Sequence, residues 1–267
     1  MKSGRSLFAI FGNPVHHSKS PLMHNLAFQK LRFPGCYTRW LLEDGTKLRE
    51  TFLNLGLKGV NITVPHKEAA MLAADVAEPF AKEVRAVNTL VLKDGNLYGY
   101  NTDAPGFYRA LMRLGDVKTA LIIGAGGTAR ALSLYLRSRG IDVEVVNRSA
   151  GRLEWFKGEG FVCHTWEGFS AEAKDVVINN TSAGLEDESL PMPKELLDQT
   201  LKSAKCAVDV IYGKETPFLK EAKKLGLPYF DGSEMLLQQG IIAFDHFTDH
   251  RYSLDEIEDA MRPFMQL

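Results

Sequence analysis

The chain has 267 residues, of which 45% are hydrophobic and 24% charged, and its formal net charge is −1. This length suits one large or two medium domains, and so small a charge argues against a general nucleic-acid or membrane-surface binder. No apolar run approaches a membrane span. The three cysteines, Cys36, Cys163 and Cys206, are scattered, which fits a reducing cytoplasm and suggests neither a disulfide framework nor a zinc site. We therefore expect a cytoplasmic protein without a bound metal.

The first polar loop follows an apolar run at Leu7–Phe11, which predicts a buried strand. Ser20 fits a helix N-cap and Pro21 the first helical position. Ser18 and Ser20 would then lie between the carboxyl end of a strand and the start of a helix, where open α/β sheets bind ligands. From the local sequence alone, capping and ligand binding explain Ser20 equally well.

The rest of the first hundred residues predicts more strands with polar exits. Strands are expected at 36–42 and 59–64, a hairpin at 86–92 and 97–100 with a type I′ turn at Asp94-Gly95, and helices at 46–55 and 104–114. Pro65 ends the strand at 59–64, and His66 and Lys67 follow. A lysine at the end of a buried strand is unusual, although a solvated surface lysine is the default interpretation. Asp103 fits a helix N-cap by itself.

The second half of the chain begins with the stretch Thr119–Ala131. Its pattern predicts an apolar strand, then a glycine-rich turn, then the start of a helix. Gly124 permits the tight turn of a dinucleotide-binding fingerprint, and Gly126 lets the backbone approach a pyrophosphate. Ala129 is the small residue where the helix packs on the strand. The pyrophosphate would bind at the positive end of the helix dipole.

The next strand, expected at 142–146, indicates which dinucleotide is bound. NAD enzymes usually carry an acidic residue at this strand's end, about 20 residues past the glycines. Here Asn147-Arg148-Ser149 stands in that place. Arg148 can pair with a 2′-phosphate, which a carboxylate would repel. The sequence therefore favours NADP(H), with a solvated loop arginine as the alternative.

The remaining elements follow in chain order. Strands are expected at 175–179, 204–211 and 229–230, helices at 217–225 and 233–247, and a final helix opened by a capping box at Ser253–Glu256. The polar turn after 175–179 contains Thr181 and suits the ribose or nicotinamide side of a cofactor.

Several motifs occur in one order over nearly the whole chain. They are Asn13-Pro14 with Ser18-Lys19-Ser20-Pro21 and His24-Asn25, Asn61 to Lys67, Ala86 to Thr89, Gly99 to Gly106, Gly124 to Ala131, Asn147 to Ser149, Asn180 to Ser182, Asp209 to Tyr212, Thr216 to Phe218, Asp231-Gly232, Met235 and Gln239. Together they resemble the shikimate dehydrogenase family. Two departures are His66, where a Phe is common, and Ser149, where a Thr is common; His66 could alter the charge felt by Lys67.

The resemblance implies reversible reduction of 3-dehydroshikimate to shikimate by NADPH. It implies Lys67 and Asp103 as the catalytic pair, and substrate contacts at Ser18, Ser20, Thr63, Asn88, Tyr212 and Gln239. The implied cofactor contacts are Gly124, Ala125, Gly126, Gly127, Thr128, Ala129, Asn147, Arg148, Ser149, Thr181, Ile211, Gly232 and Met235. Our hypothesis is that Lys67 acts as general acid and base, while Asp103 orients it and binds a substrate hydroxyl.

The fold implied is α/β with two domains. Residues 1–103 plus 236–267 would form an N-terminal substrate domain with a mainly parallel sheet, and residues 104–235 a Rossmann-type NADP-binding domain, with substrate and nicotinamide meeting in the cleft. We expect a small-molecule substrate, no nucleic-acid or membrane partner, and a monomer or homodimer. A quinate/shikimate dehydrogenase is the alternative enzyme. A non-catalytic NADP-binding sensor is a remote alternative, because Lys67 and Asp103 are both present.

Overall fold

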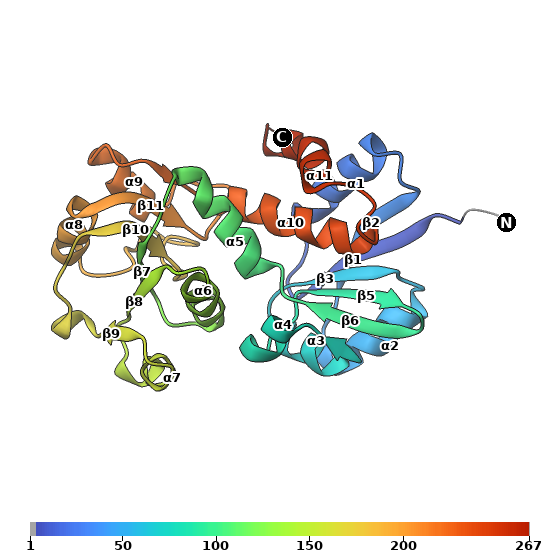
Figure 1. Ribbon diagram of the computed structural model, residues 1–267, viewed down its shortest axis with the longest axis horizontal. Helices are drawn as coiled ribbons and strands as arrows, with labels where there is room; N and C mark the ends of the chain where they lie inside the picture. The colour runs from blue at the N-terminus through green and yellow to red at the C-terminus, as the bar shows by residue number, and fades with distance from the viewer. Residues whose placement is uncertain (1–3, 267) are drawn as a thin grey trace. The chain divides into compact units, whose positions relative to one another are not determined.

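The computed structural model describes residues 4–266, and the chain divides into two compact units. Unit 1 comprises Met1–Gly106 with Leu237–Leu267, and unit 2 comprises Phe107–Leu236. Each unit contains its own six-stranded sheet (Figure 1). Within residues 4–266, no helix combines the length and the apolar character needed to cross a membrane.

The sheet of unit 1 has the strand order β2-β1-β3-β5-β6-β4. Its strands are β1 (Ser6–Gly12), β2 (Gly35–Leu41), β3 (Gly59–Ile62), β4 (Val76–Ala77), β5 (Thr89–Lys93) and β6 (Asn96–Tyr100). Only β5 runs antiparallel to its neighbours, so the prediction of a mainly parallel sheet is confirmed. Asp94 and Gly95 join β5 to β6 with φ of 49° and 81°, as the expected type I′ turn requires.

Helices cover both faces of this sheet. They are α1 (Ser20–Lys30), α2 (Leu48–Asn54), α3 (Lys67–Ala73), α4 (Pro79–Val84) and α11 (Leu254–Met261), together with the parts of α5 (Asp103–Leu111) and α10 (Ser233–Phe247) that fall in unit 1. Because side chains alternate along a strand, Phe11 of β1 faces the α2 side and packs in one core with Leu48 and Phe52.

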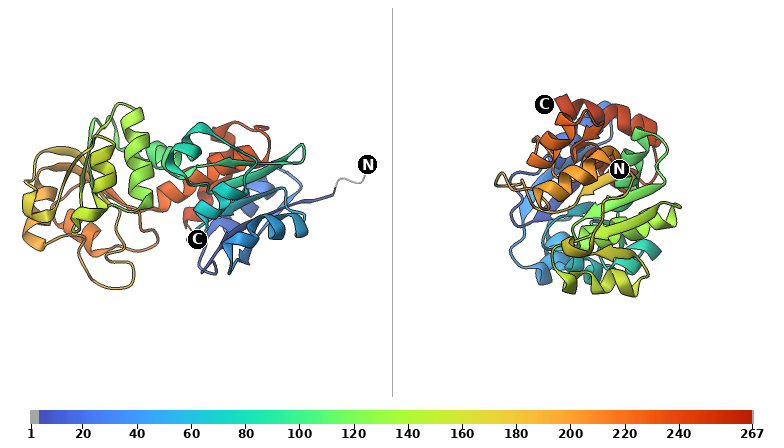
Figure 2. Two further views of the ribbon diagram at one scale, coloured as in Figure 1. Left: turned by 90° about the horizontal axis from the view of Figure 1, so that it is seen from below. Right: turned by 90° about the vertical axis from the view of Figure 1, so that its left-hand side faces the viewer.

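The opposite face of β1 meets a helix from the end of the chain. The Phe8 ring lies 4.9 Å from Phe247 of α10 and 5.1 Å from Phe28 of α1. Figures 1 and 2 show α10 and α11, in red, beside the blue α1. The first and last segments of the chain therefore share one hydrophobic core.

His24 of α1 is enclosed in this aromatic layer. Its ring stacks on Tyr37 at 4.4 Å, and neither ring nitrogen has a hydrogen-bond partner within residues 4–266. Burial lowers the pKa of His24 to about 3. The His24 ring is therefore neutral at ordinary pH and packs in the core as an aromatic group.

Unit 2 has a fully parallel sheet with the order β12-β11-β10-β7-β8-β9. Its strands are β7 (Thr119–Ile123), β8 (Asp142–Val146), β9 (Val162–His164), β10 (Lys174–Asn179), β11 (Ala204–Asp209) and β12 (Tyr229–Phe230). Its helices include α6 (Gly127–Ser138), α7 (Glu154–Gly158), α8 (Lys194–Lys202) and α9 (Pro217–Lys224). Counted from β7, this order is the 3-2-1-4-5-6 arrangement of a Rossmann fold, so the predicted fold class is confirmed.

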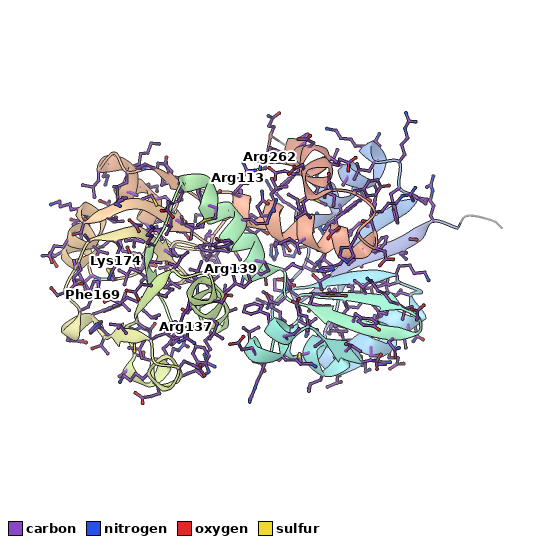
Figure 3. The ribbon with its side chains drawn as sticks, viewed as in Figure 1. Arg113, Arg137, Arg139, Phe169, Lys174 and Arg262 are labelled. Carbon is purple, nitrogen blue, oxygen red and sulfur yellow. The ribbon has the colours of Figure 1, made fainter. Side chains whose placement is uncertain are left out.

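Two arginines mark the end of α6 (Figure 3). The Arg137 guanidinium lies 4.1 Å from the Phe161 ring centroid and also donates to the carbonyl of Glu159. Arg139 lies 4.8 Å from the Tyr135 ring centroid. Cations at this helix end are favoured by the helix dipole, and the contacts of Arg137 tie the carboxyl end of α6 to the segment at 159–161.

The start of α1 differs from the sequence prediction. Lys19 occupies the N-cap position without a side-chain cap, and Ser20 is the first helical residue. The Ser20 hydroxyl instead accepts from Ser18 at 3.2 Å. Ser20 was therefore wrongly predicted as an N-cap, because its hydroxyl has a partner in the preceding loop.

The buried His24 ring makes the stability of unit 1 depend on pH. Its pKa in the folded state is about 3, whereas an unfolded histidine titrates near about 6.5, so the unfolded chain takes up the proton first as pH falls. Stability from this site is complete above about pH 6.5 and is lost progressively towards about pH 3. Between about pH 7 and about pH 5, we expect wild type to lose about 2 kcal/mol more unfolding free energy than His24→Phe in urea titrations.

His246 serves as the internal control, because burial lowers its pKa to about 4 and both proteins retain it. An equal loss of stability in the two proteins would contradict the neutral, buried state of His24.

Candidate active site

Polar residues of unit 1 gather at one edge of its sheet. Ser18 follows β1, Thr63 follows β3, and Asp103 follows β6. Because β5 runs in the opposite direction, its start at Asn88-Thr89 lies at the same edge. The carboxyl ends of parallel strands are the usual ligand-binding edge of α/β sheets.

Lys67 and Asp103 form an ion pair at this edge, with 2.6 Å between Nζ and Oδ2. The two side chains are 29% and 17% exposed, so the pair is partly shielded and still reachable. Lys67 is the first residue of α3 and Asp103 the first residue of α5. The helix dipole favours the carboxylate at such a start.

Asn101 explains why the Asp103 carboxylate is available to Lys67. The Asn101 Oδ1 accepts from the backbone N–H of Asp103 at 3.2 Å and lies 3.5 Å from that of Ala104. Asn101 therefore caps the first turn of α5, and the expectation that Asp103 is the N-cap was wrong. The carboxylate pairs with Lys67 instead.

Behind the ion pair runs a chain of buried polar side chains. The Tyr37 hydroxyl donates to Asn61 Oδ1 at 2.7 Å, and Asn61 Nδ2 donates to Thr89 Oγ1 at 2.9 Å. Thr89 donates to Asn88 Oδ1 at 3.1 Å. Asn88 Nδ2 donates to the Thr102 hydroxyl at 3.0 Å, and Asn88 Oδ1 also accepts from the backbone N–H of Thr102 at 2.8 Å. Asn88 is thereby held rigidly between β3 and the start of α5.

Gln239 reaches the same network from α10. Its Oε1 lies 3.5 Å from the Thr102 hydroxyl, and its side chain is buried. A Cβ at Gly106 would lie 2.5 Å from the Gln239 backbone nitrogen, so the absent side chain lets the start of α5 approach α10. The structure thus brings together Ser18, Ser20, Asn88 and Gln239 with the ion pair at one edge of unit 1.

Thr63 and Tyr212 complete the predicted substrate contacts. The Thr63 backbone N–H donates to Phe11 at 2.8 Å, which fixes the exit of β3 beside β1. Tyr212 belongs to unit 2 and follows β11. Burial raises the pKa of the Tyr212 phenol, so it remains a neutral hydrogen-bonding group.

His66 stands beside Lys67 with its ring buried. Its Nε2 lies 2.6 Å from the carbonyl oxygen of Leu42. Since a carbonyl can only accept, this nitrogen carries the proton. His66 therefore ties the exit of β3 to the end of β2.

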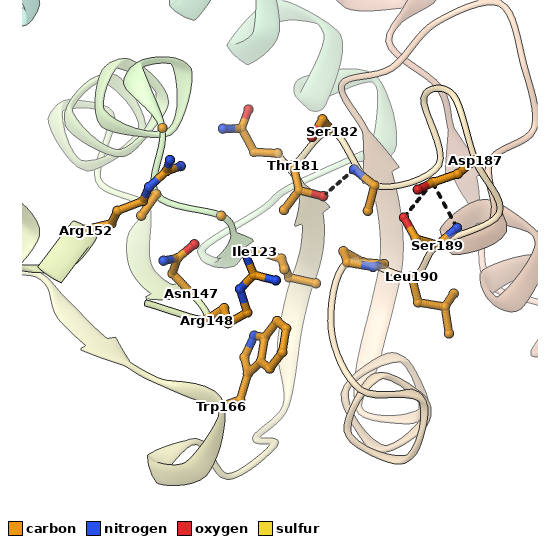
Figure 4. Close-up of a pocket in the computed structure, with 16 residues that line it drawn as sticks. Ile123, Asn147, Arg148, Arg152, Trp166, Thr181, Ser182, Asp187, Ser189 and Leu190 are labelled. Atoms are coloured by element: carbon orange, nitrogen blue, oxygen red, sulfur yellow. Dashed lines mark hydrogen bonds between the residues drawn. The ribbon is translucent and has the colours of Figure 1, made fainter. Parts of the chain in front are cut away.

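Unit 2 contains a cavity of about 440 Å³ at the carboxyl ends of β7, β8 and β10 (Figure 4). The residues predicted for the cofactor that line it are Gly124, Ala125, Gly126, Asn147, Arg148 and Thr181. The sheet order reverses between β7 and β10, and such a switch point is where these folds bind dinucleotides.

The glycine turn has the geometry that a bound pyrophosphate needs. Gly124 has φ of +110°, and a Cβ there would lie 2.8 Å from the Asn180 carbonyl oxygen. No described heavy atom lies within 4 Å of where a Cβ of Gly126 would be, so a ligand can approach this backbone. Gly126 is the N-cap of α6, which places the free N–H groups of the helix at the cavity.

Two guanidinium groups line the cavity, those of Arg148 and Arg152 (Figure 4). No carboxylate within residues 4–266 forms an ion pair with either. Asp187 and Ser189 lie across the cavity from Arg152, and the pKa of Asp187 is lowered by hydrogen bonds from Ser189 and Gly184. The cavity thus presents unpaired positive charge at the end of β8, where an anion fits.

Other residues predicted for the cofactor lie outside this cavity lining: Gly127, Thr128, Ala129, Ser149, Ile211, Gly232 and Met235. Ala129 is fully buried in α6, as its packing role requires. Gly232 donates its N–H to the Ile211 carbonyl at 2.9 Å, and a Cβ at Gly232 would collide with the Val210 carbonyl.

A buried carboxylate supports the loops beside the cavity. Asp209 accepts from Asn179 Nδ2 at 2.9 Å, from the Thr216 hydroxyl at 2.6 Å and from the Ile211 N–H at 2.9 Å. Burial raises the pKa of Asp209. Asn179 in turn accepts from Thr181 through its Oδ1. This network links the loop after β11 to the loop that lines the cavity.

The sequence interpretation missed Arg152, Trp166 and the loop at 187–191, all of which line the cavity. Arg152 was a usable signal because it is a second arginine close behind the loop at 147–149; it ends the short 3-10 turn Ala150–Arg152 that follows this loop. The loop at 187–191 carried no such signal, since its place depends on tertiary contacts.

These features define a class of protein. A parallel sheet in Rossmann order, a glycine turn at a helix start and unpaired guanidiniums characterise a dinucleotide-binding α/β protein. Residues 10–90 match the family model described as the shikimate dehydrogenase substrate binding domain.

Relatives of known name cover almost the whole chain. NADP(+)-dependent shikimate dehydrogenase of Helicobacter hepaticus is 45% identical over 253 residues, covering 94% of each chain. The same enzyme of Helicobacter pylori strain 26695 is 44% identical over 259 residues, covering 96% of this chain and 97% of that protein. The chain belongs to the shikimate dehydrogenase family.

Solved structures agree with this membership. The shikimate 5-dehydrogenase of Thermus thermophilus, in complex with NADP(H) and shikimate, has a TM-score of 0.84 at 36% identity, covering 97% of this chain and 99% of that chain. Shikimate dehydrogenase from Aquifex aeolicus has a TM-score of 0.83 at 33% identity, covering 98% and 99%. The predicted family is therefore confirmed.

Replacing Asp209 tests whether its hydrogen-bond network holds the loops beside the cavity. Asp209→Ala leaves three buried donors without an acceptor, so we expect a loss of about 3–5 kcal/mol in urea unfolding. Asp209→Asn keeps an acceptor oxygen in place and should lose clearly less. A change below about 1 kcal/mol for the alanine variant would show that the network does not hold these loops.

Proposed function

We propose that this protein catalyses the reversible, NADPH-dependent reduction of 3-dehydroshikimate to shikimate. The observation that carries the proposal is the Lys67–Asp103 ion pair, 2.6 Å long, at a sheet edge that also carries buried hydroxyl and amide groups. We assign the catalytic pair and the other substrate contacts to unit 1, and cofactor binding together with the substrate contact Tyr212 to unit 2. Its free cysteines, Cys36, Cys163 and Cys206, support a reducing cytoplasm as the working compartment.

Lys67 is proposed to move the proton of the reaction. Reduction of a ketone forms a C–H bond and leaves an alkoxide oxygen that must be protonated. The Lys67 ammonium donates a proton to that oxygen, and in the reverse direction the amine accepts the proton of the hydroxyl. Asp103 holds Nζ in place through its Oδ2 and offers its second oxygen to a substrate hydroxyl.

Neutral groups are proposed to hold the rest of the substrate. Ser18 and Ser20 bind the carboxylate, while Asn88 and Gln239 bind ring hydroxyls. Amides suit hydroxyl groups because each can both donate and accept without adding charge. The Asn88 side chain is fixed by three hydrogen bonds, so its orientation is set before substrate arrives. Thr63 and Tyr212 are assigned as further contacts.

The cavity of unit 2 supports NADP(H) as the cofactor, which supplies the hydride when bound. The open backbone at Gly126 and the start of α6 suit the pyrophosphate, and Asn147 and Thr181 offer polar groups along the lining. Arg148 and Arg152 are assigned to the 2′-phosphate, because their guanidinium groups line the cavity without an ion-pair partner among residues 4–266.

Removal of the Lys67 amine tests its role in proton transfer. For Lys67→Met, we expect kcat for shikimate oxidation to fall by about 10²- to 10⁴-fold, with KM changed far less. Lys58→Met is the matched control, because Lys58 is an exposed lysine of the same unit. A kcat of Lys67→Met within a few-fold of wild type would rule out the assigned role.

Removal of one cavity guanidinium tests the cofactor assignment. Arg148→Ala should reduce the preference for NADP over NAD by roughly 10- to 150-fold, since a hydrogen bond to a charged group is worth roughly 1.5–3 kcal/mol. The control is Arg139→Ala, whose guanidinium stacks on Tyr135. A wild-type enzyme that uses NAD equally well, or that oxidises quinate in preference to shikimate, would favour a quinate/shikimate dehydrogenase instead.

A further inference from the structure

Arg39, on the edge strand β2, is bound to the loop that carries Ser18. Its Nε and Nη2 both donate to the main-chain carbonyl oxygen of Ser18, at 2.9 Å and 2.5 Å. An exposed arginine commonly pairs with a carboxylate, but within residues 4–266 no acidic side chain forms an ion pair with Arg39. Among these residues, no carboxylate therefore offsets the positive charge of the Arg39 guanidinium beside this loop.

The carbonyl that Arg39 holds belongs to the residue whose hydroxyl organises the start of α1. The Ser18 hydroxyl accepts from the Ser20 N–H at 3.3 Å and donates to the Ser20 hydroxyl at 3.2 Å. Both side chains are buried, at 6% and 3% exposure. A shift of the Ser18 main chain would therefore displace both hydroxyls together.

The strand that carries Arg39 is itself held in place. On the inner side of β2, the Tyr37 hydroxyl donates to Asn61 Oδ1 at 2.7 Å. Tyr37 lies two residues before Arg39 on β2 and is fully enclosed. The same strand is thus anchored in the buried polar chain through Tyr37 and holds the Ser18 main chain through Arg39.

We propose that Arg39 is a positioning residue for the anionic end of the substrate. Its two donors clamp the Ser18 main chain so that the Ser18 and Ser20 hydroxyls meet a carboxylate, and its uncompensated charge favours an anion at that place. The inference rests on the proposed function, because it takes the substrate to be a carboxylate bound by these two hydroxyls. The clamp acts on binding in ground and transition states alike, so it affects KM rather than kcat.

Two substitutions of Arg39 separate the clamp from the charge. For Arg39→Gln, we expect KM for shikimate to rise about tenfold, with kcat within about threefold and KM for NADP unchanged. Arg39→Lys keeps the charge but lacks the planar two-donor fork, so its KM should fall between those of wild type and Arg39→Gln. Thermal midpoints should match wild type.

The matched control is Arg49→Gln. The Arg49 guanidinium also binds a main-chain carbonyl of unit 1, that of Ala73 at 2.8 Å, and it pairs with Asp75 at 3.0 Å. Its substitution removes the same chemical group away from Ser18. We expect the KM for shikimate to be unaffected, and a rise equal to that of Arg39→Gln would overturn the proposal.

A neutral ligand supplies the second measurement. In Arg39→Gln, the inhibition constant of shikimate methyl ester should rise clearly less than the KM for shikimate, because the ester loses only the placement of the two hydroxyls and has no charge to lose. An equal weakening of acid and ester, or an unchanged KM for shikimate, would overturn the role of Arg39. If wild type fails to oxidise shikimate, the proposed function itself falls and this inference with it; a failure confined to Arg39→Gln leaves the proposed function standing.

Discussion

The buried polar chain of unit 1 is the constraint on which the rest of its site depends. Tyr37, Asn61, Thr89 and Asn88 are all buried behind the sheet edge, and each has a hydrogen-bond partner in the next. A buried polar group that loses its partner costs the fold free energy. These hydrogen bonds therefore fix the strands relative to one another. The side chains at the sheet edge are held in fixed positions as a result.

Unit 2 uses the same arrangement with different residues. Asn179 closes β10 and Asp209 closes β11, and their hydrogen bond joins the two strand ends below the loops. In both units, an amide or carboxylate at a strand end is saturated by its neighbours, while the groups beyond it face the ligand-binding edge. These side chains are buried and hydrogen-bonded, and they hold the residues of each site in place from behind. Arg39, Arg148 and Arg152, which have no ion-pair partner among residues 4–266, stand at the rims.

The sequence predicted the fold class and family because both rest on local patterns. The glycine turn, the apolar run of β7 and the Asp94-Gly95 hairpin each carry their own backbone requirement. Capping at Ser20 could not be predicted, because the decision depended on Ser18 as a competing partner. Short helices such as α4 and the cavity residue Trp166 gave no periodic signal, since their positions come from tertiary packing. The roles of Lys67 and Asp103 stay predictions, although the two side chains do meet.

Unit 1 is built from two separate segments of the chain, and this affects the order in which the protein folds during synthesis. Phe244 and Phe247 complete the core around Phe8 and Phe28, yet they leave the ribosome more than 200 residues after Phe8. At a synthesis rate of roughly 5–20 residues per second, these rings are made on the order of 10–50 s after Phe8. The core of the first sheet is incomplete during that time. Residues 107–236 form a compact unit of their own and emerge completely during that interval. The sequential order of synthesis thus favours a nascent chain in which the middle folds before the beginning.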